Sequence, residues 1–203
     1  MSGRAARSGL CSQVLCREMS VKTGISPGGD ADRTAAVIGG GIGGLAAAIA
    51  LRARGAAARV YERRADFRDA GAAVTIWPNG LAALTKLGVA DDVRAAGRPI
   101  ERSLIRRYCG RVLCVTPVGE VSRAAGATTI AIRRADLHSA LLARLGPGVV
   151  RTGAACTGVG QDVSGAWAEF ADGTRAAADT VIGADGLRSR VRAAVLGNRP
   201  PRY

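Results

Sequence analysis

The pattern of hydrophobic positions along the chain predicts alternating strands and helices. Its clearest stretch, residues 34–62, reads TAAVIGGGIGGLAAAIALRARGAAARVYE. The unbroken apolar run at 35–38 is typical of a parallel strand that is buried on both faces. The Ala- and Leu-rich segment that follows contains no proline, which predicts a helix that extends to Arg54 and stops at Gly55. A second strand at 59–61 completes a strand, helix, strand unit.

The middle of the chain predicts two short helices and a hairpin. We expect Asn79 to cap a helix over 80–87, and a second helix spans 91–96. Residues 100–123 alternate loosely between apolar and polar positions on either side of a glycine turn, which is typical of an antiparallel hairpin. We expect residues 98–130 to leave the first sheet and to begin a second one.

The last third of the chain predicts a helix, a meander and a final strand. The helix lies within 130–145 and carries His138, which we expect to be solvated or capped and not catalytic. Turn sequences at 164–165 and 172–173 separate the strands of a three-stranded meander. A short apolar strand follows at 179–184.

Three of these strands, 35–38, 58–61 and 179–184, are expected to form one parallel sheet. The first and the last are followed by turns whose residues suit ligand binding, and ligands bind at the carboxyl ends of parallel strands. We therefore expect the last strand, which ends at Asp185, to lie beside the first strand and opposite the second. The expected fold class is α/β: a Rossmann-like domain with a parallel sheet, an inserted antiparallel meander and part of a second sheet.

Composition limits the class of protein. The 203 residues suffice for a domain with its own core, and 48% hydrophobic residues are typical of a globular chain. The net charge of +13 comes mainly from scattered arginines without interleaved aromatics, so we expect no nucleic-acid partner. No apolar run reaches the roughly 18 residues of a membrane-spanning helix, so we expect no membrane span. Five cysteines without a C-x-x-C pair and a single histidine argue against a zinc site and favour reduced thiols in the cytoplasm.

Residues 1–33 differ in composition from the rest of the chain. They are rich in Ser, Gly and Arg and show no hydrophobic period, so we expect a disordered tail and place the folded domain at 34–203. Met19 is an alternative start of translation within this tail. A basic arm that binds a partner is the alternative function of the tail.

The turn after the first strand carries the residues of a dinucleotide site. Gly39, Gly41 and Gly44 satisfy the pattern G-x-G-x-x-G. Gly39 permits a sharp turn, Gly41 leaves room for a diphosphate beside the backbone, and Gly44 lets helix and strand pack closely. The N–H groups and the dipole of the following helix would receive the phosphate charge. Glu62 lies 18 residues after Gly44, where a carboxylate can accept hydrogen bonds from both ribose hydroxyls and would repel a 2′-phosphate.

A second acid, Asp185, ends the last predicted strand and precedes the sequence GLRSRVR. A carboxylate at that edge of an open sheet can contact a ligand. It can also cap the helix that follows. The two roles do not exclude each other.

Together these motifs resemble the FAD-dependent monooxygenases of the aromatic hydroxylase type, which have the para-hydroxybenzoate hydroxylase fold. VIGGGIGGLAAAIAL is similar to their nucleotide fingerprint, and VYERR to the acid and arginine that hold the adenosine ribose. GAAVTIWPNGLAALTKLGV resembles the segment beside the flavin, RRADLHSALL their R-x-x-L helix, and IGADGLRSRVR their D-G motif. The resemblance covers about Ala35 to Gly197, with the motifs in family order.

The resemblance implies FAD as the cofactor, NAD(P)H as the co-substrate and a small substrate of aromatic type. In complete relatives NAD(P)H reduces the flavin, and O2 then supplies the oxygen atom that is added to the substrate. Arg63 and the acid before it are expected to hold the adenosine ribose. Arg134, with Arg133 as the alternative, is expected to meet the cofactor. Asp185 and Gly186 are expected to serve FAD and NAD(P)H together.

The chain departs from this family in its extent. Members are roughly twice as long, and their second half carries a G-D motif, with an Ala-His-x-x-x-Pro type of sequence, that closes the flavin site. No such motif occurs here, which predicts a truncated or split monooxygenase and a second chain that supplies the other half. The alternatives are another FAD-dependent oxidoreductase of this fold, of the halogenase or reductase type, and an inactive FAD-binding remnant. The D-G motif favours the monooxygenase, and the chain has no W-x-W-x-I-P sequence of the halogenase kind.

We therefore predict that these 203 residues alone hydroxylate no substrate, because water would reach an incompletely enclosed flavin. The measurement is NAD(P)H oxidation in air with a panel of phenols, in which product and hydrogen peroxide are quantified separately. Clean hydroxylation coupled to consumption of the reductant, with no second polypeptide present, would contradict this interpretation.

Overall fold

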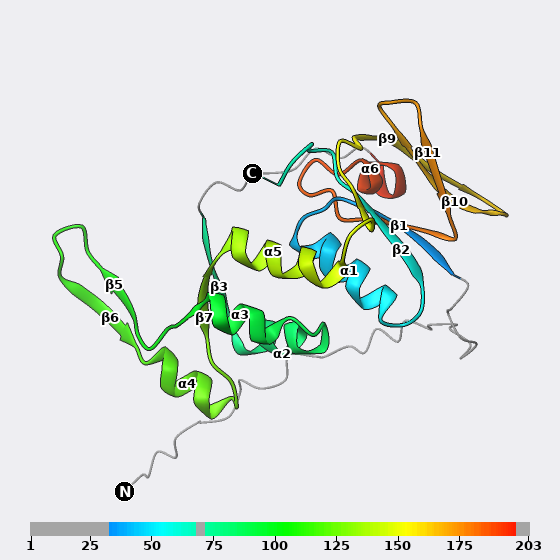
Figure 1. Cartoon of the computed structure of the whole chain (residues 1–203). Coiled ribbons are helices and arrows are strands. Elements are labelled where there is room, and N and C mark those ends of the chain that lie inside the picture. The colour runs from blue at the N-terminus through cyan, green and yellow to red at the C-terminus, as the bar shows by residue number, and fades with distance from the viewer. Residues whose placement is uncertain (1–32, 68–71, 198–203) are drawn as a thin grey trace, which may run out of the picture.

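The computed structural model describes residues 33–67 and 72–197 (Figure 1). Of the predicted tail at 1–33, all but Arg33 lies outside the described residues. The helices are α1 (Ile42–Arg52), α2 (Pro78–Lys86), α3 (Ala90–Ala96), α4 (Val118–Ala124), α5 (Arg134–Leu145) and α6 (Arg190–Leu196). Within the described ranges, no helix combines the length and the apolar character that crossing a lipid bilayer requires.

A parallel sheet organises the structure. Strand β1 (Thr34–Ile38) pairs in parallel with β2 (Ala57–Tyr61) on one side and with β12 (Thr180–Gly183) on the other. Strand β8 (Val150–Arg151) extends the sheet beyond β2, so the order is β12-β1-β2-β8. The predicted sheet, with the strand that precedes Asp185 beside the first strand and opposite the second, is therefore confirmed.

The two neighbours of β1 lie on opposite sides of it, which makes the carboxyl end of β1 a switch point of the sheet. Loops that follow such neighbours diverge and leave room for a ligand. Backbone hydrogen bonds hold the starts of these loops together. The Gly39 N–H donates to the Tyr61 carbonyl at 2.8 Å, and the Ala184 N–H donates to the Ile38 carbonyl at 2.7 Å. The turns after all three strands therefore meet at one edge of the sheet.

The remaining described strands pair antiparallel. The predicted meander consists of β9 (Cys156–Asp162), β10 (Gly165–Phe170) and β11 (Arg175–Ala178). A separate sheet in the order β3-β7-β4 consists of β3 (Ala73–Ile76), β7 (Ile130–Arg133) and β4 (Arg98–Pro99). The predicted hairpin is formed by β5 (Ser103–Arg106) and β6 (Val112–Thr116).

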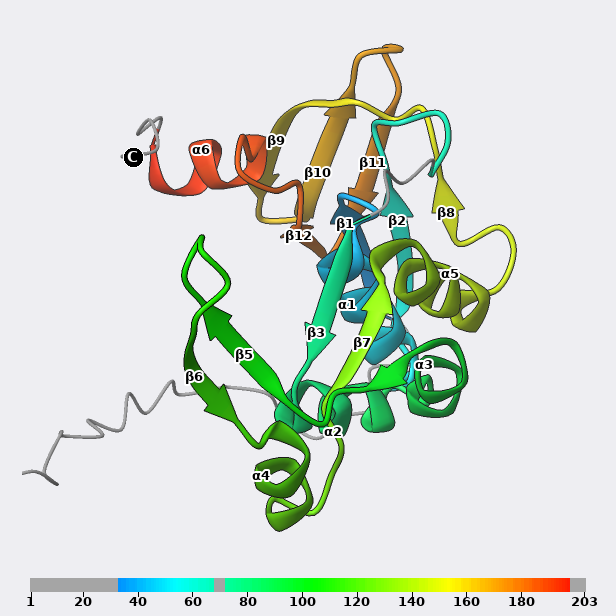
Figure 2. The same ribbon diagram turned by 90° about the vertical axis from the view of Figure 1, so that its left-hand side faces the viewer.

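Both faces of the parallel sheet are covered, which explains the unbroken apolar run of β1. Helices α1 and α5 lie on one face, where Val37, Val60 and Leu141 belong to the main core. The meander and α6 cover the other face (Figure 2), where Ile38 and Phe170 belong to a second core. The sheet thus separates two hydrophobic cores, one on each face.

The β5–β6 hairpin projects away from the rest of the described chain (Figure 1). Every residue of its two strands is exposed. The exposed side chains include large apolar ones, namely Leu104, Ile105, Val112, Leu113 and Val115. Membership of this hairpin in a substrate-domain sheet stays a prediction.

Some element boundaries differ from the sequence-based expectations. Helix α2 begins at Pro78, whose fixed φ suits the first helical position, so Asn79 lies within the first turn and does not cap it. The second strand of the hairpin ends at Thr116, and α4 follows Pro117 within a segment that was expected to be extended. Helix α1 ends at Arg52, two residues before the expected end.

The contact between α1 and β1 depends on Gly44. A Cβ atom at this position would overlap the carbonyl oxygen of Gly39 and would lie 3.3 Å from the Ala184 Cβ. A Cβ at Gly43, one residue earlier, would meet no atom within 4 Å. Of these two adjacent glycines, only Gly44 has to lack a side chain for α1 to approach the end of β1, because only there would a Cβ atom clash.

We predict that Gly44→Ala lowers the free energy of unfolding by about 3 kcal/mol or more, because backbone atoms must move to admit the methyl group. Gly43→Ala is the matched control and should raise that free energy by about 0.5–1 kcal/mol, since alanine is the better helix former. Urea unfolding of both variants and of the wild-type chain, without added ligand, measures the difference. Equal effects of the two substitutions would show that packing against Gly39 is not the cause.

Candidate functional site

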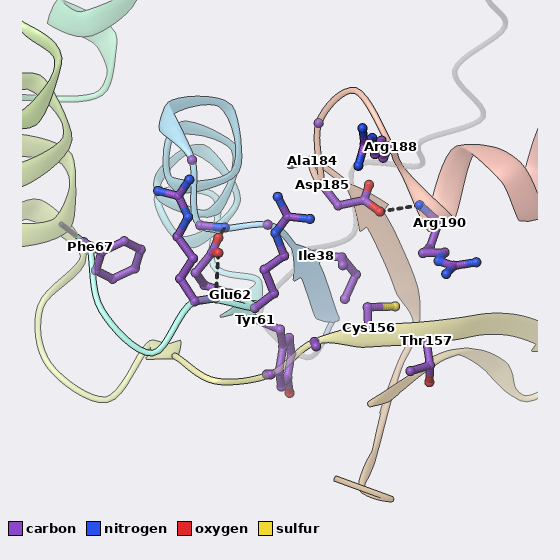
Figure 3. A pocket seen from close by; sticks show the side chains of 18 of the residues that line it. Ile38, Tyr61, Glu62, Phe67, Cys156, Thr157, Ala184, Asp185, Arg188 and Arg190 are labelled. Carbon is purple, nitrogen blue, oxygen red and sulfur yellow. Dashed lines mark hydrogen bonds between the residues drawn. The ribbon is translucent and has the colours of Figure 1, made fainter. Parts of the chain in front are cut away.

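A cavity of about 570 Å³ opens at the carboxyl edge of the parallel sheet (Figure 3). Its walls come from the turns after β1, β2 and β12, from the segment that joins β8 to β9, and from α5. Gly44 lies beside it, packed against the backbone of Gly39. The other predicted site residues all line the cavity: Gly39, Gly41, Glu62, Arg63, Arg134, Asp185 and Gly186.

The glycine loop presents backbone, not side chains, to this cavity. Gly39 has a φ of 109°, in the left-handed region that favours glycine. Gly41 lines the cavity, and a Cβ added there would meet no atom within 4 Å. Helix α1 begins directly after Gly41, and no side chain caps its first turn. The first N–H groups of α1 can therefore bind an anion placed beside Gly41.

Glu62 connects the end of β2 to the glycine loop. Its Oε2 accepts the Gly40 N–H at 2.7 Å, and its Oε1 accepts the Arg64 N–H at 2.9 Å. A carboxylate offers about four lone-pair positions, so each oxygen can accept one more hydrogen bond. The half-buried Glu62 side chain therefore combines a structural role with free acceptor capacity at the cavity wall.

Asp185 accepts hydrogen bonds from the start of α6, whose N-cap residue is Ser189, and it also lines the cavity. Its carboxylate accepts the Ser189 hydroxyl at 2.5 Å and the Arg190 N–H at 2.6 Å (Figure 3). These bonds hold the turn from β12 into α6, in which Gly186 has a φ of 80°. Both roles considered for Asp185 are thus compatible with its position.

The cavity carries a surplus of positive charge. Among its described lining residues, Glu62 and Asp185 are the two carboxylates. They face five arginines, namely Arg63, Arg64, Arg134, Arg188 and Arg190. This balance favours an anionic ligand such as a diphosphate. Three of these arginines were not predicted, because in a chain with scattered arginines only the fold shows which of them converge.

The two arginines at the start of α5 have different surroundings. Arg134 is the first residue of the helix and lines the cavity. Arg133 forms a two-point salt bridge with Asp136, with both N–O distances at 2.8 Å, and this hydrogen bonding raises the pKa of its guanidinium. Of the two candidates, Arg134 is the one that the structure brings to the cavity.

His138 is not solvated, so that alternative of the expectation was wrong, and its ring is instead buried with a hydrogen-bond partner. Its side chain is buried in the described structure and its residue is 7% exposed. Its Nε2 lies 2.7 Å from the Gly40 carbonyl oxygen, and its ring packs on Phe67 with 4.6 Å between centroids. His138 follows Arg134 by four residues, which places both on one face of α5. That spacing was the signal in the sequence that could have located His138 at the cavity.

Cys156, at the start of β9, brings a thiol to the cavity wall. Burial raises the pKa of Cys156, and the carboxylate of Asp185 raises it further. No motif surrounds this residue, so sequence reasoning had no signal for it. Among the residues that the structure describes, no group of three or more His, Cys, Asp or Glu side chains could hold a metal ion.

The geometry of the cavity agrees with a comparison of the sequence with protein families. A family model described as FAD binding domain matches residues 32–199. The chain belongs to this family. The matched range includes the glycine loop, both acids and all five arginines of the cavity.

Known relatives of this FAD-binding domain are flavin-dependent hydroxylases, which confirms the resemblance found in the sequence. The chain is 45% identical over 168 residues to a 3-amino-4-hydroxybenzoate 2-monooxygenase of Streptomyces platensis, a match that covers 81% of this chain and 42% of that protein. It is 35% identical over 169 residues to an FAD-dependent urate hydroxylase of Klebsiella pneumoniae, covering 83% and 44%. The crystal structure of Klebsiella pneumoniae HpxO with FAD and uric acid matches with a TM-score of 0.78 and 34% identity, covering 84% of this chain and 43% of that chain. The chain thus spans less than half the length of these relatives.

We predict that Cys156 of this FAD-binding domain reacts with iodoacetamide several-fold more slowly than the exposed Cys109, because burial and Asp185 disfavour its thiolate. Timed alkylation at neutral pH, followed by peptide mapping with mass spectrometry, measures both rates. In urea-unfolded chain, which is the control, the two thiols should react alike. Equal rates in the folded chain would contradict the surroundings described for Cys156.

Proposed function

We propose that the cavity binds FAD, with the adenosine end of the cofactor at the glycine loop and Glu62. Three features that meet at one edge of the sheet carry this proposal: the exposed backbone of the loop, the Glu62 carboxylate and the surplus of arginines. Gly39, Gly41 and the start of α1 would receive the diphosphate. Glu62 and Arg63 would hold the adenosine ribose. Membership of the FAD binding domain family supports this assignment.

The opposite wall would position the rest of the cofactor. Arg134 at the start of α5 would contribute positive charge to the bound FAD. Asp185 and Gly186, at the turn after β12, would serve both FAD and NAD(P)H. We assign these residues to binding and orientation, and none of them to acid or base catalysis.

We further propose that this FAD-binding domain is part of a monooxygenase that hydroxylates an aromatic or similar small organic substrate. Bound FAD would supply the redox chemistry, since it can take electrons from NAD(P)H and pass them to O2. The residues of the chain would bind the cofactor, orient it and limit the access of water. Relatives named for hydroxylation of 3-amino-4-hydroxybenzoate and of urate support this class of substrate.

The β5–β6 hairpin supports the proposal that further polypeptide packs on this domain. Leu104, Ile105 and Leu113 are 45%, 59% and 53% exposed on a projecting element. Contiguous exposed apolar side chains usually mark a contact with protein. We propose that a substrate-binding part, in the same or in a second chain, covers the hairpin and forms a sheet with it.

The co-substrate and the cellular location are also proposals. NAD(P)H is supported by the D-G motif at 185–186, which lines the cavity. Among the described cysteines, Cys109, Cys114 and Cys156 are free thiols, which favours a reducing compartment such as the cytoplasm.

We predict that Glu62→Ala weakens FAD binding by about 1–3 kcal/mol, the usual loss when a charged hydrogen-bond acceptor is removed. Glu120→Ala is the matched control, because Glu120 is an exposed carboxylate on α4 that does not line the cavity. Titration of each variant with FAD, followed by flavin fluorescence, gives the dissociation constants. Wild-type affinity in Glu62→Ala, or equal weakening in Glu120→Ala, would count against the proposed site.

A further inference from the structure

Gly40 occupies a variable position of the G-x-G-x-x-G motif, and both its backbone N–H and its carbonyl group have a side-chain hydrogen-bond partner. Its N–H donates to Glu62 Oε2 at 2.7 Å, and its carbonyl oxygen lies 2.7 Å from His138 Nε2. A carbonyl oxygen can only accept a hydrogen bond, so Nε2 of His138 carries the proton and donates it. Phe67 packs on the imidazole and limits its rotation.

The bond from His138 determines how the peptide between Gly40 and Gly41 is turned. Two consecutive glycines have little conformational preference of their own, so an external contact has to select one orientation. In a trans peptide the C=O and N–H bonds point in opposite directions, and the described residues contain no cis peptide. Because the Gly40 carbonyl points to His138, the Gly41 N–H points away from it. Gly41 lines the cavity, and a Cβ atom added there would meet no atom within 4 Å.

His138 also connects α5 to the loop. Arg134 and His138 lie one helical turn apart on α5, and both line the cavity. Helix α5 itself packs on α1, which starts at the end of the loop. A single helix therefore brings a cation to the cavity and holds the backbone that borders it.

We propose that His138 is a positioning residue for a dinucleotide diphosphate: it holds the Gly40–Gly41 peptide so that the Gly41 N–H is directed to the phosphate oxygens. This inference rests on the proposed function, since FAD supplies the diphosphate. His138 acts through the Gly40 carbonyl and not on the ligand itself. Its contribution is therefore specific to ligands that carry a diphosphate.

The test compares ADP and adenosine as probes, by isothermal titration calorimetry on the full chain. His138→Leu should bind ADP roughly 3- to 10-fold more weakly, as expected for the loss of one hydrogen bond, and should bind adenosine like the wild type. His138→Gln keeps an N–H near the position of Nε2 and should return the ADP affinity to within about twofold of wild type. Ser139→Leu places the same new side chain at the exposed neighbour of His138 and should change neither affinity.

A second measurement follows the Gly41 amide directly. In NMR spectra of the wild-type chain, ADP should shift the amide resonance of Gly41. The shift should be lost in His138→Leu and retained in His138→Gln. If loss of cooperative melting shows that His138→Leu does not fold, His138→Asn replaces it, because the shorter amide does not reach Gly40.

The outcomes separate the inference from the proposed function. Equal weakening of ADP and adenosine in the leucine variant, or no change in either, would overturn the role of His138 while FAD binding by the wild-type chain stands. Failure of the wild-type chain to bind FAD in a fluorescence titration would overturn the proposed function, and this inference with it.

Discussion

The backbone contact between strand β1 and helix α1 is the constraint on which the rest of the site depends. Gly44 has no side chain, so the first turn of α1 can approach the carbonyl of Gly39 directly. That approach places the N-terminus of a helix at the carboxyl edge of the sheet, where the turns after β2 and β12 also end. Without it, the first N–H groups of α1 would not lie beside the cavity that the two acids and the arginines line.

Charged side chains surround the cavity beside this contact: two carboxylates and five arginines line it. Glu62 and Asp185 each accept two hydrogen bonds of 2.9 Å or less from the protein, so both carboxylates are oriented before any ligand arrives. Five arginines line the same cavity, and a bound diphosphate would offset their positive charge. A ligand that binds the folded chain in this way also stabilises it, so binding and stability of the FAD-binding domain would be linked.

The projecting β5–β6 hairpin differs from the parallel sheet in its burial. The parallel sheet has a core on each face, whereas both strands of the hairpin are exposed along their whole length. A two-stranded ribbon has too little buried surface to be stable by itself. The proposal that further polypeptide packs on the hairpin agrees with the share of the longer relatives that the chain covers.

The sequence by itself determined the parallel sheet, the meander, the glycine loop and the position of Glu62 at the end of β2. These features follow from local rules, because an unbroken apolar run, a glycine that must turn or pack closely, and a fixed spacing along one βαβ unit can all be read without knowing the fold. The start of α2 at Pro78 and the helix α4 after Pro117 differ from the sequence-based expectation, because proline suits the start of a helix as well as a turn.

Only the tertiary structure decided which side chains converge from separate elements. Arg64, Arg188 and Arg190 lie within the segments VYERR and IGADGLRSRVR, but neither segment shows that its arginines border a common cavity. They become a group only where the ends of β2 and β12 meet. His138 is buried because α5 packs across the glycine loop, and a contact between residues 98 positions apart is not encoded in the pattern of either segment. The physical reason is the same in each case: local sequence governs backbone conformation, whereas burial and charge clustering depend on which elements the sheet order places side by side.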